Sequence, residues 1–100
     1  MMPHLILEYS SNIETIDFQD LFAKLHQALV DTGAFRMVGI RSRAEKREIY
    51  RLADGNPDYT FVHLWVYIRE GRPLDIQQQA GENLLQVLKT ELAPLYETGH

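Results

Sequence analysis

The chain contains no cysteine, so disulfide bridges, thiolate metal ligands and a cysteine nucleophile are all excluded. Any stability beyond that of one small hydrophobic core must therefore come from packing or from oligomerisation. The four histidines are scattered along the sequence without the spacing of metal ligands. The sequence accordingly gives no indication of a metal site.

Long apolar runs and an excess of basic charge are also missing. No stretch approaches the roughly 20 apolar residues of a membrane-spanning helix, and the first residues lack the basic start and apolar core of a signal peptide. We therefore expect a cytoplasmic protein that does not bind membranes. The formal net charge of −4 argues against a general attraction to nucleic acid.

The composition that remains is that of one ordinary globular domain. The 100 residues are 45% hydrophobic and 24% charged, which is enough apolar material for one core. We expect a single domain over residues 1–100. The sequence shows no internal repeat at the level of residues and no low-complexity segment.

The first half of the chain predicts a strand followed by a helix. Residues 5–9 are apolar on both faces, which is typical of a central strand. Asp17 is well placed to cap a helix, and Gly33 to end it. Apolar residues recur between them at helical spacing, at Leu21, Phe22, Leu25, Ala28 and Leu29.

The second half predicts three strands and another helix. Two short strands are expected over residues 37–44 and 47–52, although neither face of the second is cleanly apolar. Residues 54–58 indicate a turn. The segment 59–68 alternates aromatic and aliphatic residues, as a strand with two different faces would. A second helix follows Pro73, and Pro94 is expected to end or kink it; its predicted buried stripe is Leu74, Ala80, Leu84, Leu85, Leu88 and Leu92.

The order of these elements predicts an α+β fold, a mixed sheet with two helices packed on one face. The strand at 5–9, the first helix and the strand at 37–44 would form one right-handed β-α-β crossover. The strand at 59–68 and the second helix would form a similar unit without its closing strand.

Pro3 is the first candidate for chemistry. If Met1 and Met2 are removed, its nitrogen becomes a secondary amine at the end of a buried strand. Apolar surroundings and nearby cations would lower the pKa of such an amine and make it a general base near neutral pH. The alternative is a proline that merely starts a strand. His4 could tune the amine or could be an ordinary strand residue.

Arg41, together with Arg43, and Arg72 are the other candidates. A guanidinium group suits carboxylate substrates because it offers two parallel hydrogen bonds. Arg41 could approach Pro3 if it lies partway along its strand. The alternative for each arginine is a solvated surface position, since six of the ten basic residues fall in the stretch 36–51 among interleaved carboxylates.

His63 and Trp65 share the aromatic face of the strand at 59–68. They could line a pocket, but a core or a subunit interface is the more common role for such residues.

Several short motifs, in one order through most of the chain, resemble the 5-carboxymethyl-2-hydroxymuconate isomerase family of the tautomerase superfamily. They are Pro3-His4 before an apolar strand, Leu21-Phe22-Ala23-Lys24, Thr32-Gly33 with Phe35, Gly39-Ile40-Arg41-Ser42-Arg43, Ala53-Asp54-Gly55, Asp58-Tyr59, Phe61-Val62-His63, Gly71-Arg72 and Gln78-Gln79-Ala80-Gly81-Glu82.

The resemblance implies a homotrimer of β-α-β units, a cofactor-free active site near a subunit interface and a catalytic amino-terminal proline. Carried over by motif, the base is Pro3, and Arg41 and Arg72 bind or polarise a small anionic dienol or oxo-acid, with Arg43 as an additional candidate. The expected reaction converts a 2-hydroxymuconate-type dienol to its 2-oxo isomer in aromatic-acid breakdown, with no metal or nucleotide.

The sequence departs from the family pattern at both ends. Family members begin Met-Pro, whereas this chain begins Met-Met-Pro, so we expect exposure of Pro3 to require removal of both methionines. The family continues beyond the second helix into a segment with strand character, whereas this sequence stops at His100, so we expect either a shortened chain or a divergent, smaller relative. Two alternatives stay open at this stage: a catalytically silent tautomerase-fold oligomer, and a small nucleic-acid-binding module that uses the basic stretch 36–51 with the aromatic strand.

Overall fold

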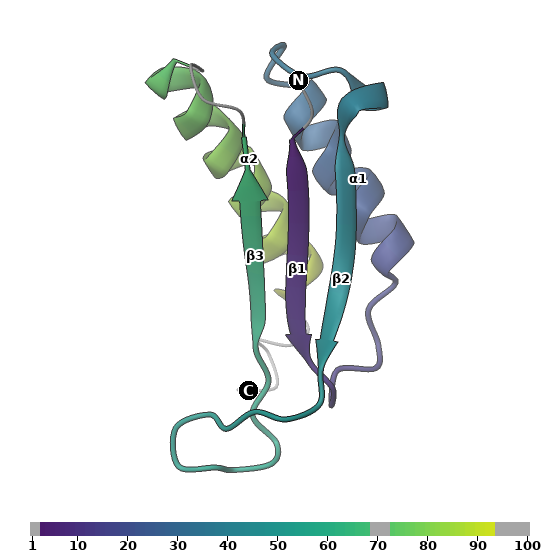
Figure 1. Ribbon diagram of the computed structural model, residues 1–100, viewed down its shortest axis with the longest axis vertical. Coiled ribbons are helices and arrows are strands. Elements are labelled where there is room, and N and C mark those ends of the chain that lie inside the picture. The colour runs from purple at the N-terminus through teal and green to yellow at the C-terminus, as the bar shows by residue number, and fades with distance from the viewer. Residues whose placement is uncertain (1–2, 69–72, 94–100) are drawn as a thin grey trace.

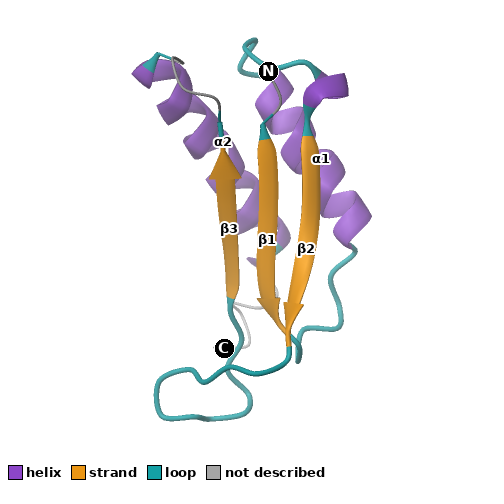
Figure 2. Ribbon diagram, viewed as in Figure 1, coloured by secondary structure: helices purple, strands orange, loops and turns teal. Residues whose placement is uncertain are grey.

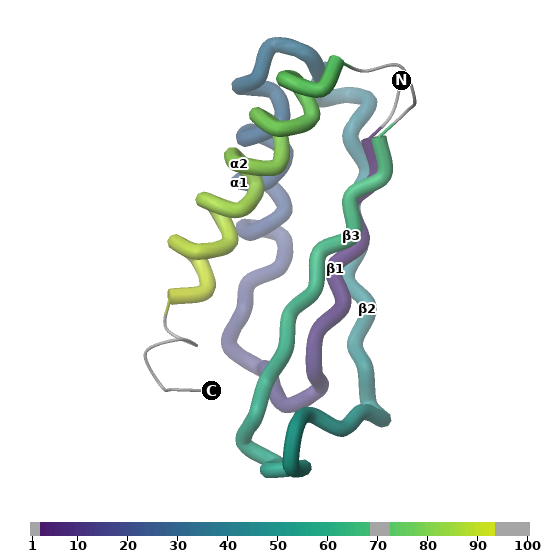
Figure 3. The backbone as a smooth tube through the Cα atoms, turned by 90° about the vertical axis from the view of Figure 1, so that its left-hand side faces the viewer, coloured from purple at the N-terminus to yellow at the C-terminus, as the bar shows by residue number. Residues whose placement is uncertain are grey.

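A computed structural model describes residues 3–68 and 73–93 as two layers (Figure 1). One layer is a three-stranded sheet, and both helices cover one of its faces (Figure 3). The elements, in chain order, are β1 (His4–Ser10), α1 (Phe18–Val30), a 3₁₀ turn η1 (Met37–Gly39), β2 (Arg41–Arg47), β3 (Val62–Tyr67) and α2 (Leu74–Glu91). The predicted α+β class with a mixed sheet is confirmed.

The sheet has the strand order β2-β1-β3 (Figure 2). β2 runs parallel to β1 and β3 runs antiparallel to it. The prediction that the first strand is central is therefore confirmed, and its apolar composition follows because strands flank it on both edges while helices cover one face. Leu5 and Leu7 point into the helix layer and are fully buried.

The first helix forms where its capping residues and apolar spacing predict it. The Asp17 carboxylate accepts a hydrogen bond from Asp20 N at 3.1 Å, which satisfies one of the free N–H groups at the helix start. At the other end Gly33 adopts φ = +81°, a conformation that favours glycine. Between these ends Leu21 and Leu25 pack against the sheet in the core.

Replacing Asp17 by alanine should lower the free energy of unfolding by about 1 kcal/mol, because the capped N–H then loses its acceptor. Urea titration followed by circular dichroism measures this change. Glu14→Ala is the matched control, since it removes an exposed carboxylate just outside the helix. Equal losses in the two variants would show that the cap contributes nothing.

Two of the predicted strand positions are wrong. Met37–Gly39 forms a 3₁₀ turn, so β2 begins only at Arg41. The separate strand predicted over 47–52 does not form: β2 ends at Arg47, and residues 48–61 form a long loop that extends past the end of the sheet (Figure 1). Neither face of that segment could be buried against the core, and the Ile49 side chain is 98% exposed.

The third strand is shorter than predicted, but its alternation is confirmed. Val62 and Leu64 pack against the core on the helix side, whereas His63, Trp65 and Tyr67 lie on the other side of the sheet and are exposed. The sheet therefore has one covered face and one open face. Among the described residues, the open face is formed by His4, Ile6, Glu8, Arg41, Arg43, Glu45, Arg47, His63, Trp65 and Tyr67.

The second helix is confirmed, with a correction to its buried stripe. Ala80 and Leu84 are buried, but Leu74 and Leu85 are 67% and 52% exposed. These two leucines are eleven residues apart, about three helical turns, and so share a flank that turns away from the core. Arg72 and Pro94, which were predicted to flank this helix, lie outside the described residues.

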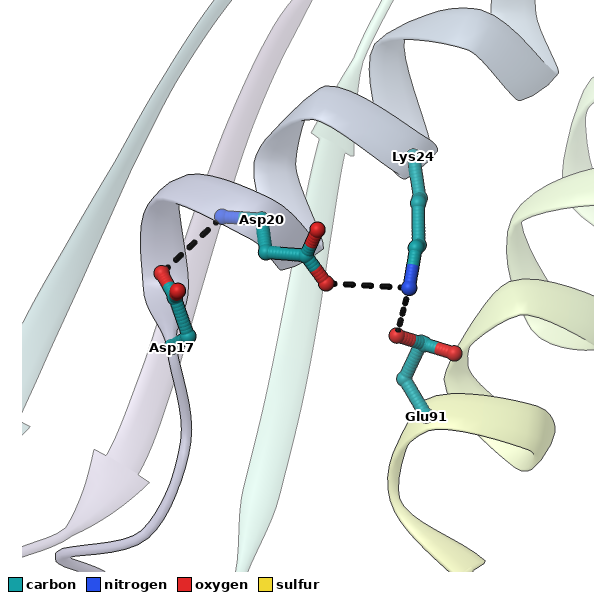
Figure 4. Close-up of polar contacts among 4 residues, drawn as sticks. All are labelled: Asp17, Asp20, Lys24 and Glu91. Atoms are coloured by element: carbon teal, nitrogen blue, oxygen red, sulfur yellow. Dashed lines mark hydrogen bonds and ion pairs between the residues drawn. The ribbon is translucent and has the colours of Figure 1, made fainter.

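Polar contacts join the two helices on their outer side. The Lys24 ammonium group lies 2.9 Å from a carboxylate oxygen of Asp20, which is on the same helix (Figure 4). It also lies 2.5 Å from a carboxylate oxygen of Glu91 on α2. These hydrogen bonds raise the pKa of Lys24 to about 12. Further along, the Asn83 side chain donates to the Ala28 carbonyl oxygen at 3.0 Å. In the described parts of the chain, no helix is both long and apolar enough to cross a membrane.

Candidate active site

Pro3 immediately precedes β1, and its side chain is fully buried. Its carbonyl oxygen accepts a hydrogen bond from Arg41 N at 3.0 Å. This bond aligns the starts of the two parallel strands. Arg41 is thus the first residue of its strand, not a residue partway along it as predicted, and the later start of β2 is what brings Arg41 beside Pro3.

A row of three polar side chains crosses the open face next to Pro3. His4 pairs with Arg41 on one side and with Tyr67 on the other. All three point away from the helices, because the flanking Leu5 faces the core. His4 is therefore an ordinary strand residue by position, yet it lies between an arginine and a tyrosine.

The next row brings the second arginine to the same end of the sheet. Ile6 lies between Arg43 and Trp65. Within the described residues, neither Arg41 nor Arg43 forms an ion pair with a carboxylate. Arg41 Nη1 donates to the Val38 carbonyl oxygen at 3.1 Å. No carboxylate in the described ranges therefore competes with an anionic ligand for either cation.

Farther from Pro3 the charges on the open face are neutralised. The Glu8 carboxylate accepts hydrogen bonds from Arg47 Nε at 2.8 Å and from Trp65 Nε1 at 2.6 Å. These two bonds hold the pKa of Glu8 below its ordinary value, and the bond from Arg47 has the larger effect. The His63 ring stacks on Trp65 with centroids 4.4 Å apart. On the part of this face that the structure describes, the arginines without a carboxylate partner therefore lie at the Pro3 end.

The structure brings together only part of the predicted site. Pro3, Arg41 and Arg43 lie at one end of the sheet, whereas Arg72, Met1 and Met2 lie outside the described residues. Sequence reasoning did not include Tyr67 in the site. Tyr67 is the last aromatic residue of the alternating strand. This position indicates a place beside His4 only when the antiparallel pairing of β3 with β1 is known.

One large recess lies away from these residues. A groove of about 470 Å³ separates the outer sides of α1 and α2, and none of the predicted site residues lines it. The part of the chain that is described holds no cluster of three or more His, Asp or Glu residues suited to a metal ion. The site as described is thus an open end of a sheet with a buried proline and two unpaired arginines.

Comparison with known proteins places this arrangement in a family. The model of the 5-carboxymethyl-2-hydroxymuconate isomerase family matches residues 3–100. The 5-carboxymethyl-2-hydroxymuconate Delta-isomerase of Escherichia coli is 46% identical over 98 residues, which are 97% of this chain and 78% of that protein.

Solved structures show the same relationship. The crystal structure of a 5-carboxymethyl-2-hydroxymuconate isomerase from Deinococcus radiodurans R1 is 36% identical, with a TM-score of 0.90 over 96% of this chain and 73% of that one. A fused 4-OT symmetric trimer shares the fold, with a TM-score of 0.73 over 90% of this chain and 74% of that one, at 14% identity. The chain therefore belongs to the 5-carboxymethyl-2-hydroxymuconate isomerase family.

Proposed function

We propose that the protein isomerises 5-carboxymethyl-2-hydroxymuconate, or a closely related 2-hydroxymuconate dienol, to the 2-oxo isomer without a cofactor, and that it does so in the cytoplasm. The observation that carries this proposal is the hydrogen bond from Arg41 N to Pro3 O, which sets a carboxylate-binding side chain beside the candidate base. Membership of the isomerase family supports the same reaction.

Pro3 is the general base in this proposal. Its nitrogen, once terminal, takes the proton from the 2-hydroxyl group of the dienol, and the resulting ammonium returns a proton to a carbon farther along the conjugated system. The hydroxyl oxygen becomes the 2-oxo group, so no atoms are gained or lost. A neighbouring guanidinium favours the neutral amine at working pH, which is the form that can accept a proton.

The arginines supply binding and electrostatic stabilisation. Arg41 and Arg72 hold the carboxylates of the substrate and draw electron density toward the oxo end, and Arg43, one row farther from Pro3, is placed to assist. Charge moves through the conjugated chain during the transfer. Fixed cations can therefore stabilise the transition state more than the ground state.

The test of the reaction is direct. Purified protein with Pro3 as its first residue should accelerate loss of the dienol absorbance of 5-carboxymethyl-2-hydroxymuconate over the buffer rate. In deuterium oxide the product should carry one deuterium at the reprotonated carbon. Absence of turnover with correctly processed protein would favour a silent member of the fold.

We further propose that the protein assembles as a homotrimer through the open face of the sheet. Trp65 and Tyr67 are 42% and 55% exposed on this face. Ile6, on the central strand β1, is the residue that pairs with Trp65. Partly exposed aromatic side chains of this kind are typical of subunit interfaces. A relative of the same fold is described as a symmetric trimer, which agrees with this assembly.

Light scattering at micromolar concentration should therefore give the mass of three subunits. Trp65→Ser should shift the distribution toward monomer, because it removes the largest apolar side chain of that face, whereas Leu85→Ser on the far side of the molecule should not. A wild-type protein that stays monomeric would remove the interface from the proposal. Salt-sensitive binding of single-stranded RNA would instead favour a nucleic-acid-binding role.

A further inference from the structure

A second polar pair lies in a groove on the helix side of β2. The groove, about 510 Å³, runs between α1 and the outer edge of the strand. Phe18, Phe22 and His26 are four residues apart on α1, so their side chains line one wall in a row. Ser42 and Ala44 line the other wall, because the residues that pair with Leu5 and Leu7 face the helices.

The pair itself has the geometry of a nucleophile and its base. His26 Nε2 lies 2.8 Å from Ser42 Oγ, and both residues are half-buried. This is the separation found between an activated hydroxyl and the imidazole that takes its proton. Partial burial lowers the pKa of His26, which favours the neutral ring whose Nε2 can accept the hydroxyl proton. Arg43 is the other ionisable residue that lines the groove.

Backbone donors are available beside Ser42. In β2 the N–H of Arg41 donates to the Pro3 carbonyl oxygen, and the carbonyl oxygen of Arg47 accepts from Ser11 N, so both groups point toward β1. Because these groups alternate in direction along a strand, the N–H groups of Ser42 and Ala44 point away from β1, toward the edge of the sheet where no further strand is described. They are placed to donate to a carbonyl oxygen of a ligand held at Ser42.

We propose that Ser42 and His26 form a second reactive site, which accepts the acyl group of small aryl esters. Phe18 and Phe22, whose ring centroids are 6.2 Å apart, offer the apolar surface for the aromatic part of the ester. The outward N–H groups of the edge strand stabilise the oxyanion. This activity does not use the amine of Pro3.

The chemical step balances without any cofactor. Ser42 Oγ attacks the ester carbonyl carbon while its proton passes to His26 Nε2. The tetrahedral intermediate collapses, the carbon–oxygen bond to the phenol breaks, and the proton on Nε2 goes to the departing phenolate. Water then attacks the acyl-serine, again through His26, and releases the carboxylic acid and the free serine.

The experiment uses p-nitrophenyl butyrate and full-length protein that retains Met1 and Met2, in which Pro3 is an amide and cannot be acylated. Wild-type protein should release nitrophenol at pH 7.5 at least tenfold faster than Ser42→Ala, and peptide mapping should locate the butyryl group on Ser42. Ser11→Ala is the matched control and should behave as wild type. His26→Gln, which keeps a polar side chain at that position, should lose most of the rate.

The pH profile separates base catalysis from a merely structural contact. The wild-type rate should rise through one ionisation below the ordinary histidine pKa and stay level above it, and His26→Gln should lose that step. Equal rates in wild type and Ser42→Ala, or butyryl groups found only on lysines and the terminal amine, would overturn the proposal.

Discussion

Protein that begins at Pro3 is expected to isomerise 2-hydroxymuconate dienols at least about 100-fold faster than protein that retains Met1 and Met2. A terminal proline nitrogen is a basic secondary amine, whereas an acylated one is an amide whose lone pair is delocalised into the carbonyl group. The amide cannot take up a proton at neutral pH. Loss of a general base typically costs between 10² and 10⁴ in rate.

Intact-mass analysis identifies the first residue of each preparation, and the loss of dienol absorbance gives the two rates. The same two forms should unfold at the same urea concentration, which controls for damage to the fold. If both forms turn over the dienol equally well, Pro3 is not the base. If neither does, the silent relative becomes the better description.

Replacing Arg41 by alanine should reduce kcat/KM by one to two decades, which corresponds to about 1.5–3 kcal/mol of lost transition-state binding. The backbone of Arg41 is bonded to Pro3, and its guanidinium has no carboxylate partner among the described residues, so we expect its charge to act on the substrate. Stability should barely change because the side chain is exposed. Arg72→Ala is expected to show a loss of similar size.

Arg41→Lys keeps the charge but not the paired hydrogen bonds, and it should recover only part of the activity. Arg51→Ala is the matched control, since this exposed arginine lies in the long loop past the other end of the sheet and bonds to the Asp54 carbonyl oxygen. Wild-type kinetics in both the Arg41 and the Arg72 variant would show that these are ordinary surface arginines and that their assignment by family motif had failed.

Local features of the sequence determined several elements. Asp17, the leucine spacing and Gly33 specify α1 within the chain itself, because a cap, an apolar stripe and a glycine stop act over a few residues. The alternation around Trp65 likewise identifies a strand with two faces. The series of short motifs in one order from Pro3 to Glu82 indicated the family and the reaction it implies.

Other features depended on contacts between distant segments. The sequence could not show that Arg41, rather than Met37, starts β2, because the start is set by pairing with Pro3 and His4. The exposure of Leu74 and Leu85 depends on which side of α2 packs against the core. The periodicity of apolar residues alone does not define that side.

The arrangement of charge shows the same division most clearly. From the sequence, Arg41, Arg43 and Arg47 are three similar arginines, two and four residues apart. Tertiary pairing gives Arg47 the Glu8 carboxylate and leaves the other two without one among the described residues. Short-range propensity decides which elements form, whereas register across strands decides which side chains meet. The sequence thus determined the candidates, and only the folded sheet decided which of them lie together at the Pro3 end.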